Sequence, residues 1–300
     1  MIEMIHLLKL GLSEPQYSSF DECENACLAA NKSDSITATI KLSLRATSIG
    51  QAFAIGYRCA LQALLPELKQ DQWAAFCATE LKGNHPKQIE THVNGEGIIH
   101  GHKTFVSMGT RAQQLIVLAK AGEQDERPLL KAVLVNAAQD EMRISDMPDL
   151  GMIPDIPHGQ LMISGAHGKV LSGDGYLEFS KRFRTLEDVH VLASFVSFII
   201  SMVVRYKLSD ELFTRGVYLL QGCADHSLQN SASQHLVLDE RFKLFDEWVV
   251  EFEKSLSELP DSFSDAWERD RKLFHIAGKA RQKRAQNALK DIKTLLQAKV

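Results

Sequence analysis

Aromatic and hydroxyl side chains gather in two short stretches of the sequence. The first stretch contains Phe76 and Thr79, and the second contains Phe105 and Ser107. Aromatic rings provide contact area for a ligand, and hydroxyls donate and accept hydrogen bonds. Each of these residues taken alone is more simply a core or strand residue. Only the two stretches together indicate a binding site.

Other reactive groups do not form a recognisable site. The eleven histidines are dispersed, and none has the H-E-x-x-H spacing of a zinc enzyme. His100 and His102 share a face of an expected strand, but two ligands alone predict no metal site. No G-x-S-x-G motif or phosphate-loop spacing occurs. The five cysteines are scattered and odd in number, as expected of reduced thiols in a cytosol.

Length and composition indicate a soluble protein of two or three domains. Its 300 residues can bury a large core, and the net charge of -4 gives no general attraction to nucleic acid or to an anionic membrane. The amino-terminal residues do not resemble a secretion signal, so we expect a cytoplasmic protein. The most apolar segment, 189–204, is shorter than the roughly 20 residues that span a bilayer. We therefore interpret it as a helix of a bundle or of an interface between subunits.

The chain changes character twice along its length. Residues 1–74 show apolar side chains at helical spacing, and residues 75–182 show short apolar runs bounded by turn residues. Residues 183–300 return to helical patterns. We expect a shortened helical domain, a middle β-barrel domain and a domain like a four-helix bundle. In the last domain the expected helices are 186–207, 211–229, 236–257, one that Asp265 caps and that ends near Ala277, and 280–298.

This order and the two stretches resemble the acyl-CoA dehydrogenase family. Ala75 to Glu80 resembles the segment that holds the flavin ring in that family, and Lys103 to Gly109 resembles its second flavin motif. The resemblance covers about residues 40–295 and implies an α+β multidomain fold. It also implies an FAD cofactor, an acyl-CoA or related thioester as ligand, and a homodimer or homotetramer.

The resemblance assigns roles to particular residues. Asn84 lies in a Gly-Asn-His turn where the family usually has Gly-Ser-Asp, and it would face the acyl chain. A flavin ring is flat and apolar with a polar edge, so an aromatic wall, hydroxyls and backbone amides would hold it. The residues that would do so are Phe76, Ala78, Thr79, Phe105, Val106 and Ser107.

The family's catalytic carboxylate has no counterpart at its usual place. Aligned over Arg269 to Arg284, the family's Glu falls on Gly278. A positioned base contributes about 10²- to 10⁴-fold to a rate, and glycine cannot act as one. Gly278 is otherwise explained as a left-handed cap that closes the preceding helix. Glu187 is an alternative base, or an ordinary acid in the first turn of a helix.

Two segments that hold the phosphates of FAD in the family are also replaced. KLSDELFT follows Tyr206 where the family has Arg-x-x-Phe-Gly, and ELPDSFSD precedes the Arg-Asp helix where the family has Gly-Gly-x-Gly. A dinucleotide depends on charge-assisted phosphate contacts. We therefore expect weak or absent occupancy by FAD.

Residues 279–300 contain seven lysines and arginines and one acid. This basic helix could contact a CoA phosphate, an RNA backbone or an acidic partner, or it could be a solvated face. It contains no aromatic residue, which disfavours stacking on single-stranded nucleic acid.

Three functions remain open. The first is an FAD-dependent oxidoreductase that acts on the CH-CH group of an acyl thioester. The second is a non-catalytic relative, a pseudoenzyme that binds an acyl thioester or a protein partner. The third is a flavin monooxygenase on the same fold, in which oxygen chemistry replaces proton abstraction and His275 could assist, unless that histidine packs in the bundle.

Overall fold

The computed structural model describes residues 2–30, 34–226, 228–229 and 231–297. The chain forms two compact units. The helical unit comprises Met1–Ala60, Gly151–Ile153 and Thr185–Val300, and the strand unit comprises Leu61–Leu150 and Pro154–Arg184. The first and last predicted domains both contribute to the helical unit, and the limits of the three predicted domains stay predictions.

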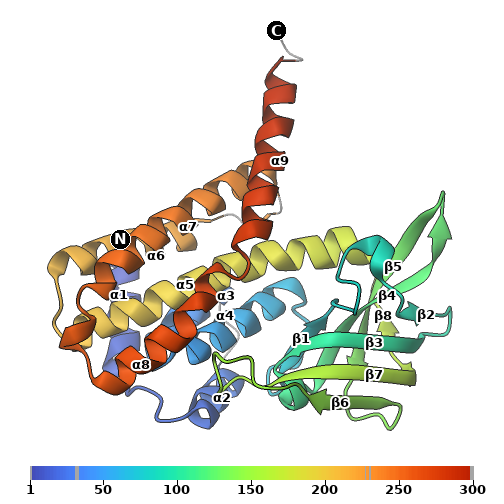
Figure 1. The fold of residues 1–300 in the computed structure, drawn as a ribbon, viewed down its shortest axis with the longest axis horizontal. Helices are drawn as coiled ribbons and strands as arrows, with labels where there is room; N and C mark the ends of the chain where they lie inside the picture. Colours follow the sequence, from blue (N-terminus) through green and yellow to red (C-terminus); the bar gives the residue numbers. More distant parts are fainter. Residues whose placement is uncertain (1, 31–33, 227, 230, 298–300) are drawn as a thin grey trace. The chain divides into compact units, whose positions relative to one another are not determined.

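The α-helices fall before and after the strands, as the sequence predicts (Figure 1). They are α1 Ile2–Ser13, α2 Phe20–Ala29, α3 Ser35–Ser43, α4 Ile49–Leu64, α5 Arg182–Arg205, α6 Asp210–Ala224, α7 Ala232–Glu253, α8 Asp261–Asp270 and α9 Gly278–Gln297.

Side-chain caps explain where several helices begin. Ser19 accepts a hydrogen bond from an amide in the first turn of α2, Ser209 does so for α6, and Ser231 for α7. The expected cap at Asp265 is wrong, because α8 already begins at Asp261, directly after Pro260. Proline suits this place, since the first helical amides have no partner within the helix.

Helix α5 is the central helix of the helical unit. A π-helical turn, Gly175–Lys181, precedes it, so the helix runs without a break over residues 175–205. Within the described ranges this is the one helix long and apolar enough to cross a membrane, and 89% of its most apolar window is buried. The length argument from the sequence was therefore wrong, but burial supports the interpretation as a core helix.

The backbones of α4 and α5 approach closely at Gly56. A Cβ atom there would lie 2.8 Å from Val191 Cα and 3.0 Å from the His190 carbonyl oxygen. Nearby, the Ser194 hydroxyl bonds to the Ala52 carbonyl and lies 2.9 Å from the Ser43 hydroxyl. Small side chains thus allow polar contacts inside an apolar helix pair.

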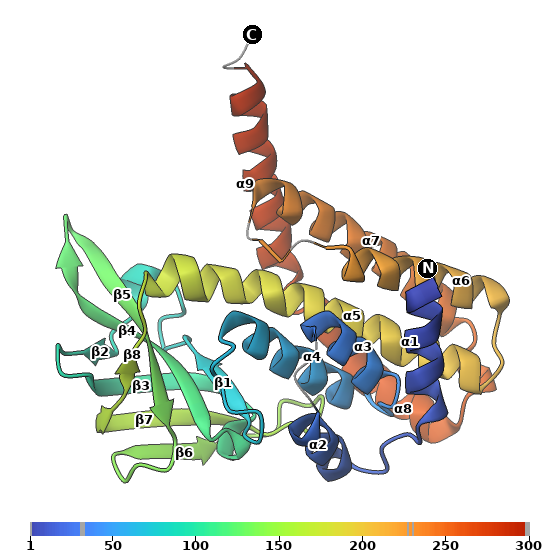
Figure 2. The same cartoon turned by 180° about the vertical axis from the view of Figure 1, so that it is seen from behind.

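The strand unit contains one curled sheet (Figure 2). Its strand order is β6-β7-β3-β2-β4-β5-β8, and β1 pairs in parallel with β4. Residues 115–119 of β4 are fully buried, which makes that strand the centre of the core. The strands are β1 Ala74–Cys77, β2 His92–Val93, β3 Ile98–Ser107, β4 Gln114–Gln124, β5 Arg127–Asn136, β6 Met142–Asp146, β7 His158–His167 and β8 Lys169–Val170.

Candidate functional site

The strand unit brings the two predicted ring-binding stretches together. Thr79 follows the end of β1, and its carbonyl oxygen accepts a hydrogen bond of 2.9 Å from the Thr104 amide in β3. Phe105 and Ser107 follow on the same strand. Residues about 25 positions apart in the sequence thus form one local surface.

Three side chains of this surface have groups that the protein does not use internally. Phe105 is 36% exposed, and its ring centroid lies 4.9 Å from that of His158. In the described part of the chain, neither the Thr79 hydroxyl nor the Ser107 hydroxyl makes a hydrogen bond. An exposed aromatic face beside two unused hydroxyls is suited to a flat ligand with a polar edge.

His158 belongs to this surface although nothing in the sequence singled it out. It pairs with Ser107 across β3 and β7, and its Nδ1 lies 2.9 Å from the Ile156 carbonyl. Burial lowers the pKa of His158. A neutral imidazole that donates from Nδ1 to this carbonyl keeps Nε2 as an acceptor.

The backbone directly after Ser107 is strained. Met108 has φ 70° and Gly109 has φ 45°, both in the left-handed region. A non-glycine residue there costs about 1 kcal/mol or more and persists only where its surroundings enforce it. This turn fixes the end of β3 and hence the position of Ser107.

The other predicted ring-binding residues are core residues. Phe76 stacks on Phe183 at a centroid distance of 4.9 Å, and Ala78 belongs to a buried cluster with Leu118. Val106 is fully buried. Any contribution from these three residues to ring binding would come through backbone or packing, and their role stays a prediction.

A pocket of about 750 Å³ adjoins the Gly-Asn-His turn. Asn84 itself is exposed, while His85, Lys87 and Arg127 line the pocket together with Tyr176. Two cations, a histidine and an aromatic residue can bind an anionic group attached to an apolar body. The rest of the lining includes Pro86, Gln124, Asp125, Pro128, Leu129, Leu130, Asp174 and Leu177.

An ion pair buried in the strand unit anchors this turn. Lys103 Nζ donates to Glu80 Oε1 at 2.6 Å and to the Leu118 carbonyl at 2.6 Å, and Lys103 is fully buried. The Glu80 carboxylate also accepts from the amides of Glu90, at 2.7 Å, and Thr91, at 3.1 Å. Burial alone would raise the pKa of Glu80, but Lys103 and these amides together lower it.

This pair was missed from the sequence, although strand alternation contained a signal. Ile99 is buried on β3, and positions 101 and 103 follow it on the same face. A lysine on the buried face of a strand requires an acidic partner. Glu80, at the end of β1, is that partner.

Gly278 does not close the preceding helix. It is the first residue of α9 and has no left-handed backbone, so its interpretation as a left-handed cap is wrong. A Cβ atom there would meet only Arg281, at 4.0 Å. Glycine at position 278 therefore has no conformational reason, and the position provides no proton acceptor.

The acid that is buried on α5 is Asp188, next to the predicted base Glu187. Glu187 is half-buried, and it is not in the first turn, because the helix begins at residue 175. Asp188 accepts hydrogen bonds from Arg281, at 3.1 Å, and from Arg284. Burial raises the pKa of Asp188, and the two guanidinium groups oppose this shift. The segment aligned with the catalytic loop thus provides cations that neutralise a carboxylate.

The Arg-Asp pair before Gly278 is structural. Arg269 makes hydrogen bonds of 2.8 and 2.7 Å to the buried carboxylate of Asp270, which also accepts from the Ile153 amide at 2.6 Å. His275 is 66% exposed and lies 3.8 Å from Asp246, so its expected packing in the bundle is wrong.

The residues fit a flavin ring better than they fit its phosphates. The ring edge has Thr79 and Ser107 as partners, as described above. The two segments aligned with the phosphate-binding motifs contain only one cation, Lys207, and many acids. Asp210 and Glu211 occupy the first turn of α6, where a phosphate would otherwise bind. The acids of these segments are Asp210, Glu211, Glu258, Asp261 and Asp265.

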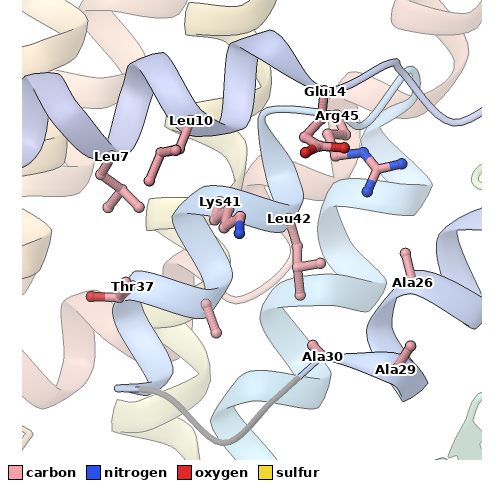
Figure 3. A pocket seen from close by; sticks show the side chains of 11 residues that line it. Leu7, Leu10, Glu14, Ala26, Ala29, Ala30, Thr37, Lys41, Leu42 and Arg45 are labelled. Atoms are coloured by element: carbon pink, nitrogen blue, oxygen red, sulfur yellow. The ribbon is translucent and has the colours of Figure 1, made fainter.

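A second pocket, of about 570 Å³, lies among α1, α2 and α3 of the helical unit (Figure 3). Leu7, Leu10 and Leu42 point into it, and Lys41 and Arg45 lie at its edge. It can hold an apolar group but has no nucleophile. Across the described ranges, no three histidine, cysteine, aspartate or glutamate side chains lie close enough together to hold a metal ion.

Solved structures show which known fold this is. The prolyl acyl carrier protein oxidase AnaB is similar with a TM-score of 0.69 at 14% identity, over 96% of this chain and 98% of that chain. PigA with FAD and proline has a TM-score of 0.68 at 10% identity, over 95% and 96%. Butyryl-CoA dehydrogenase from Megasphaera elsdenii has 0.65 at 12%, over 95% and 97%. No family model matches the sequence, and no curated protein sequence matches it significantly.

The chain therefore has the fold of the acyl-CoA dehydrogenases over about 95% of its length. The predicted α+β architecture, with helices before and after a curled sheet, is confirmed. At these identities the likeness establishes the fold.

Proposed function

We propose that this protein binds an acyl thioester and is not an acyl-CoA dehydrogenase of the usual kind. The observation that carries the proposal is Gly278 at the start of α9, followed by Arg281 and Arg284, which neutralise the nearby buried acid. Without a carboxylate at position 278, abstraction of the α-proton lacks its usual base.

The pocket of the strand unit supports a thioester ligand. Lys87 and Arg127 suit the phosphates that coenzyme A and the phosphopantetheine arm of a carrier protein share. Two similar structures are named for such substrates, butyryl-CoA and a prolyl acyl carrier protein. Asn84, next to this pocket, would face the acyl chain.

FAD is a weak ligand in this proposal. When bound, a flavin accepts a hydride from the acyl group. Phe105 would cover one face of the ring, and the Thr79 and Ser107 hydroxyls would bond its edge. The acids in place of the phosphate motifs oppose retention of the whole dinucleotide.

The unused hydroxyls and the exposed Phe105 keep two flavin enzymes as second candidates. One is a dehydrogenase with another base, such as Glu187, and the other is a flavin monooxygenase that needs no base at position 278. Homo-oligomeric assembly and a cytoplasmic location also stay predictions.

Absorbance of the purified protein, with cofactor quantitation, tests the cofactor. We expect little bound flavin and no bleaching when butyryl-CoA is added anaerobically to FAD-supplemented protein. A yellow protein with stoichiometric FAD that butyryl-CoA bleaches would be a dehydrogenase and would refute the proposal.

Calorimetric titration with coenzyme A and butyryl-CoA tests the ligand. Lys87→Glu with Arg127→Glu should weaken binding by about tenfold or more, because two phosphate partners become repulsive. Lys82→Glu is the matched control, since Lys82 is exposed and outside the pocket lining. Equal affinity of the double variant and the native chain would contradict the assignment of the pocket.

A further inference from the structure

The far half of α9 exposes a row of leucines. Leu289 is 42% exposed, and Leu295 and Leu296 are each 63% exposed, whereas Ala285 and Ala288 are buried. Both views show the end of α9 standing clear of α7 (Figures 1 and 2). Water-exposed leucines at a helix end indicate a missing partner.

These leucines continue the stripe that packs α9 within the chain. Ala285, Ala288, Ile292 and Leu295 follow each other at spacings of three, four and three residues. The near half of the stripe is held, since Arg281 lies 3.2 Å from the centre of the Phe242 ring of α7. The far half extends the same apolar face without a neighbour to bury it.

Charge limits what this neighbour can be. Residues 278–297 contain six basic residues and one acid. In the described part of the chain, Lys283, Lys290 and Lys293 have no acidic partner. A partner of the far half must therefore present acids beside apolar side chains.

The outer face of α7 has this character. Val237, Glu240, Leu244 and Glu247 are spaced by three, four and three residues, and Val250 follows. Val237 is 41% exposed and Val250 is 55% exposed. Residues 232–253 contain six acids and two basic residues, and Glu247 has no partner in the described part of the chain.

We propose that two copies of this chain assemble by placing the far half of α9 of one copy on the outer face of α7 of the other. The exchange can be reciprocal, as in a two-fold dimer. Pairing of two α9 helices is less favourable because Lys290 and Lys293 would face their own copies. RNA would leave the leucines in water. This inference is independent of thioester binding.

Sedimentation velocity of the full chain at micromolar concentrations tests the assembly. The native chain should form dimers or larger species. Leu295→Gln with Leu296→Gln should raise the dissociation constant by about tenfold or more, because two apolar side chains lose their burial. Leu81→Gln is the matched control, since Leu81 is 89% exposed in the strand unit. Circular dichroism should show unchanged helix content in both.

A charge exchange distinguishes α7 from α9 as the docking surface. Lys290→Glu with Lys293→Glu should weaken assembly, as should Glu240→Lys with Glu247→Lys. A mixture of these two double variants retains one interface with restored complementarity, so it should form heterodimers that neither variant forms with itself. A monomeric native chain, or leucine variants that assemble normally, would overturn the proposal. A mixture that fails to associate would overturn the assignment to α7.

Discussion

The ammonium group of Lys103 has no contact with water, so its charge depends on Glu80 for compensation. The carboxylate, in turn, fixes the amides of Glu90 and Thr91 at the far end of the turn that contains Asn84. This pair therefore supports the chain segment beside the proposed thioester pocket without touching a ligand.

Lys103→Met should lower the free energy of unfolding by about 3 kcal/mol, because it leaves a buried carboxylate uncompensated. Glu80→Gln combined with Lys103→Met should recover part of this loss, since no buried charge remains. Urea unfolding measures both. Lys82→Met is the matched control because the Lys82–Glu90 pair is exposed, and its unfolding midpoint should stay unchanged. A single variant as stable as the native chain would show that the pair is not needed.

His190 on α5 makes the stability dependent on pH. Its ring is fully buried, with Nδ1 2.7 Å from the Leu186 carbonyl and Nε2 2.9 Å from the Ser35 hydroxyl. Burial lowers the pKa of His190 to about 4, below the ordinary value of 6.5. Between these values the unfolded chain binds a proton that the folded chain does not.

Stability should therefore fall as the pH falls from 6.5 towards 4, by up to about 3 kcal/mol from this group. His190→Gln should flatten the dependence of the unfolding free energy on pH in that window. His6→Gln should not, because His6 is exposed in the folded chain. A slope that is the same in the His190 variant and the native chain would contradict this origin.

At the scale of the element, the beginning of α9 decides how Gly278 is understood. Its position in a right-handed first turn means that a side chain is tolerated there. Gly278→Ala should then raise the free energy of unfolding by about 0.5 kcal/mol, because alanine restricts the unfolded chain and meets no obstacle. Thermal unfolding checks this. Destabilisation by about 1 kcal/mol or more would instead indicate the left-handed cap.

At the scale of the whole molecule, pattern and order were readable from the sequence. Alternating apolar runs separated by turn residues predicted the sheet, and three- and four-residue spacing predicted the helices. The proximity of Thr79 to Phe105 followed from resemblance, since no local pattern links residues on different strands. The fold is thus largely predictable, while the roles of the ring-binding residues stay predictions.

Three features required the structure because they depend on distant contacts. The partner of Lys103 lies 23 positions earlier, on another strand. The neutralisation of Asp188 by Arg281 and Arg284 joins helices far apart in the sequence. The start of the α5 helix at residue 175 includes a π-helical turn, for which hydrophobic periodicity gives no signal.

The contact at Gly56 sets the register of two helices without any charge. Because the α5 backbone occupies the space of a side chain there, α4 cannot slide along α5 without bringing a larger neighbour, Phe53 or Tyr57, towards the same spot. A single missing methyl group acts as a notch that prevents axial slippage. Enlarging this residue should therefore wedge the pair apart and loosen the whole helical core.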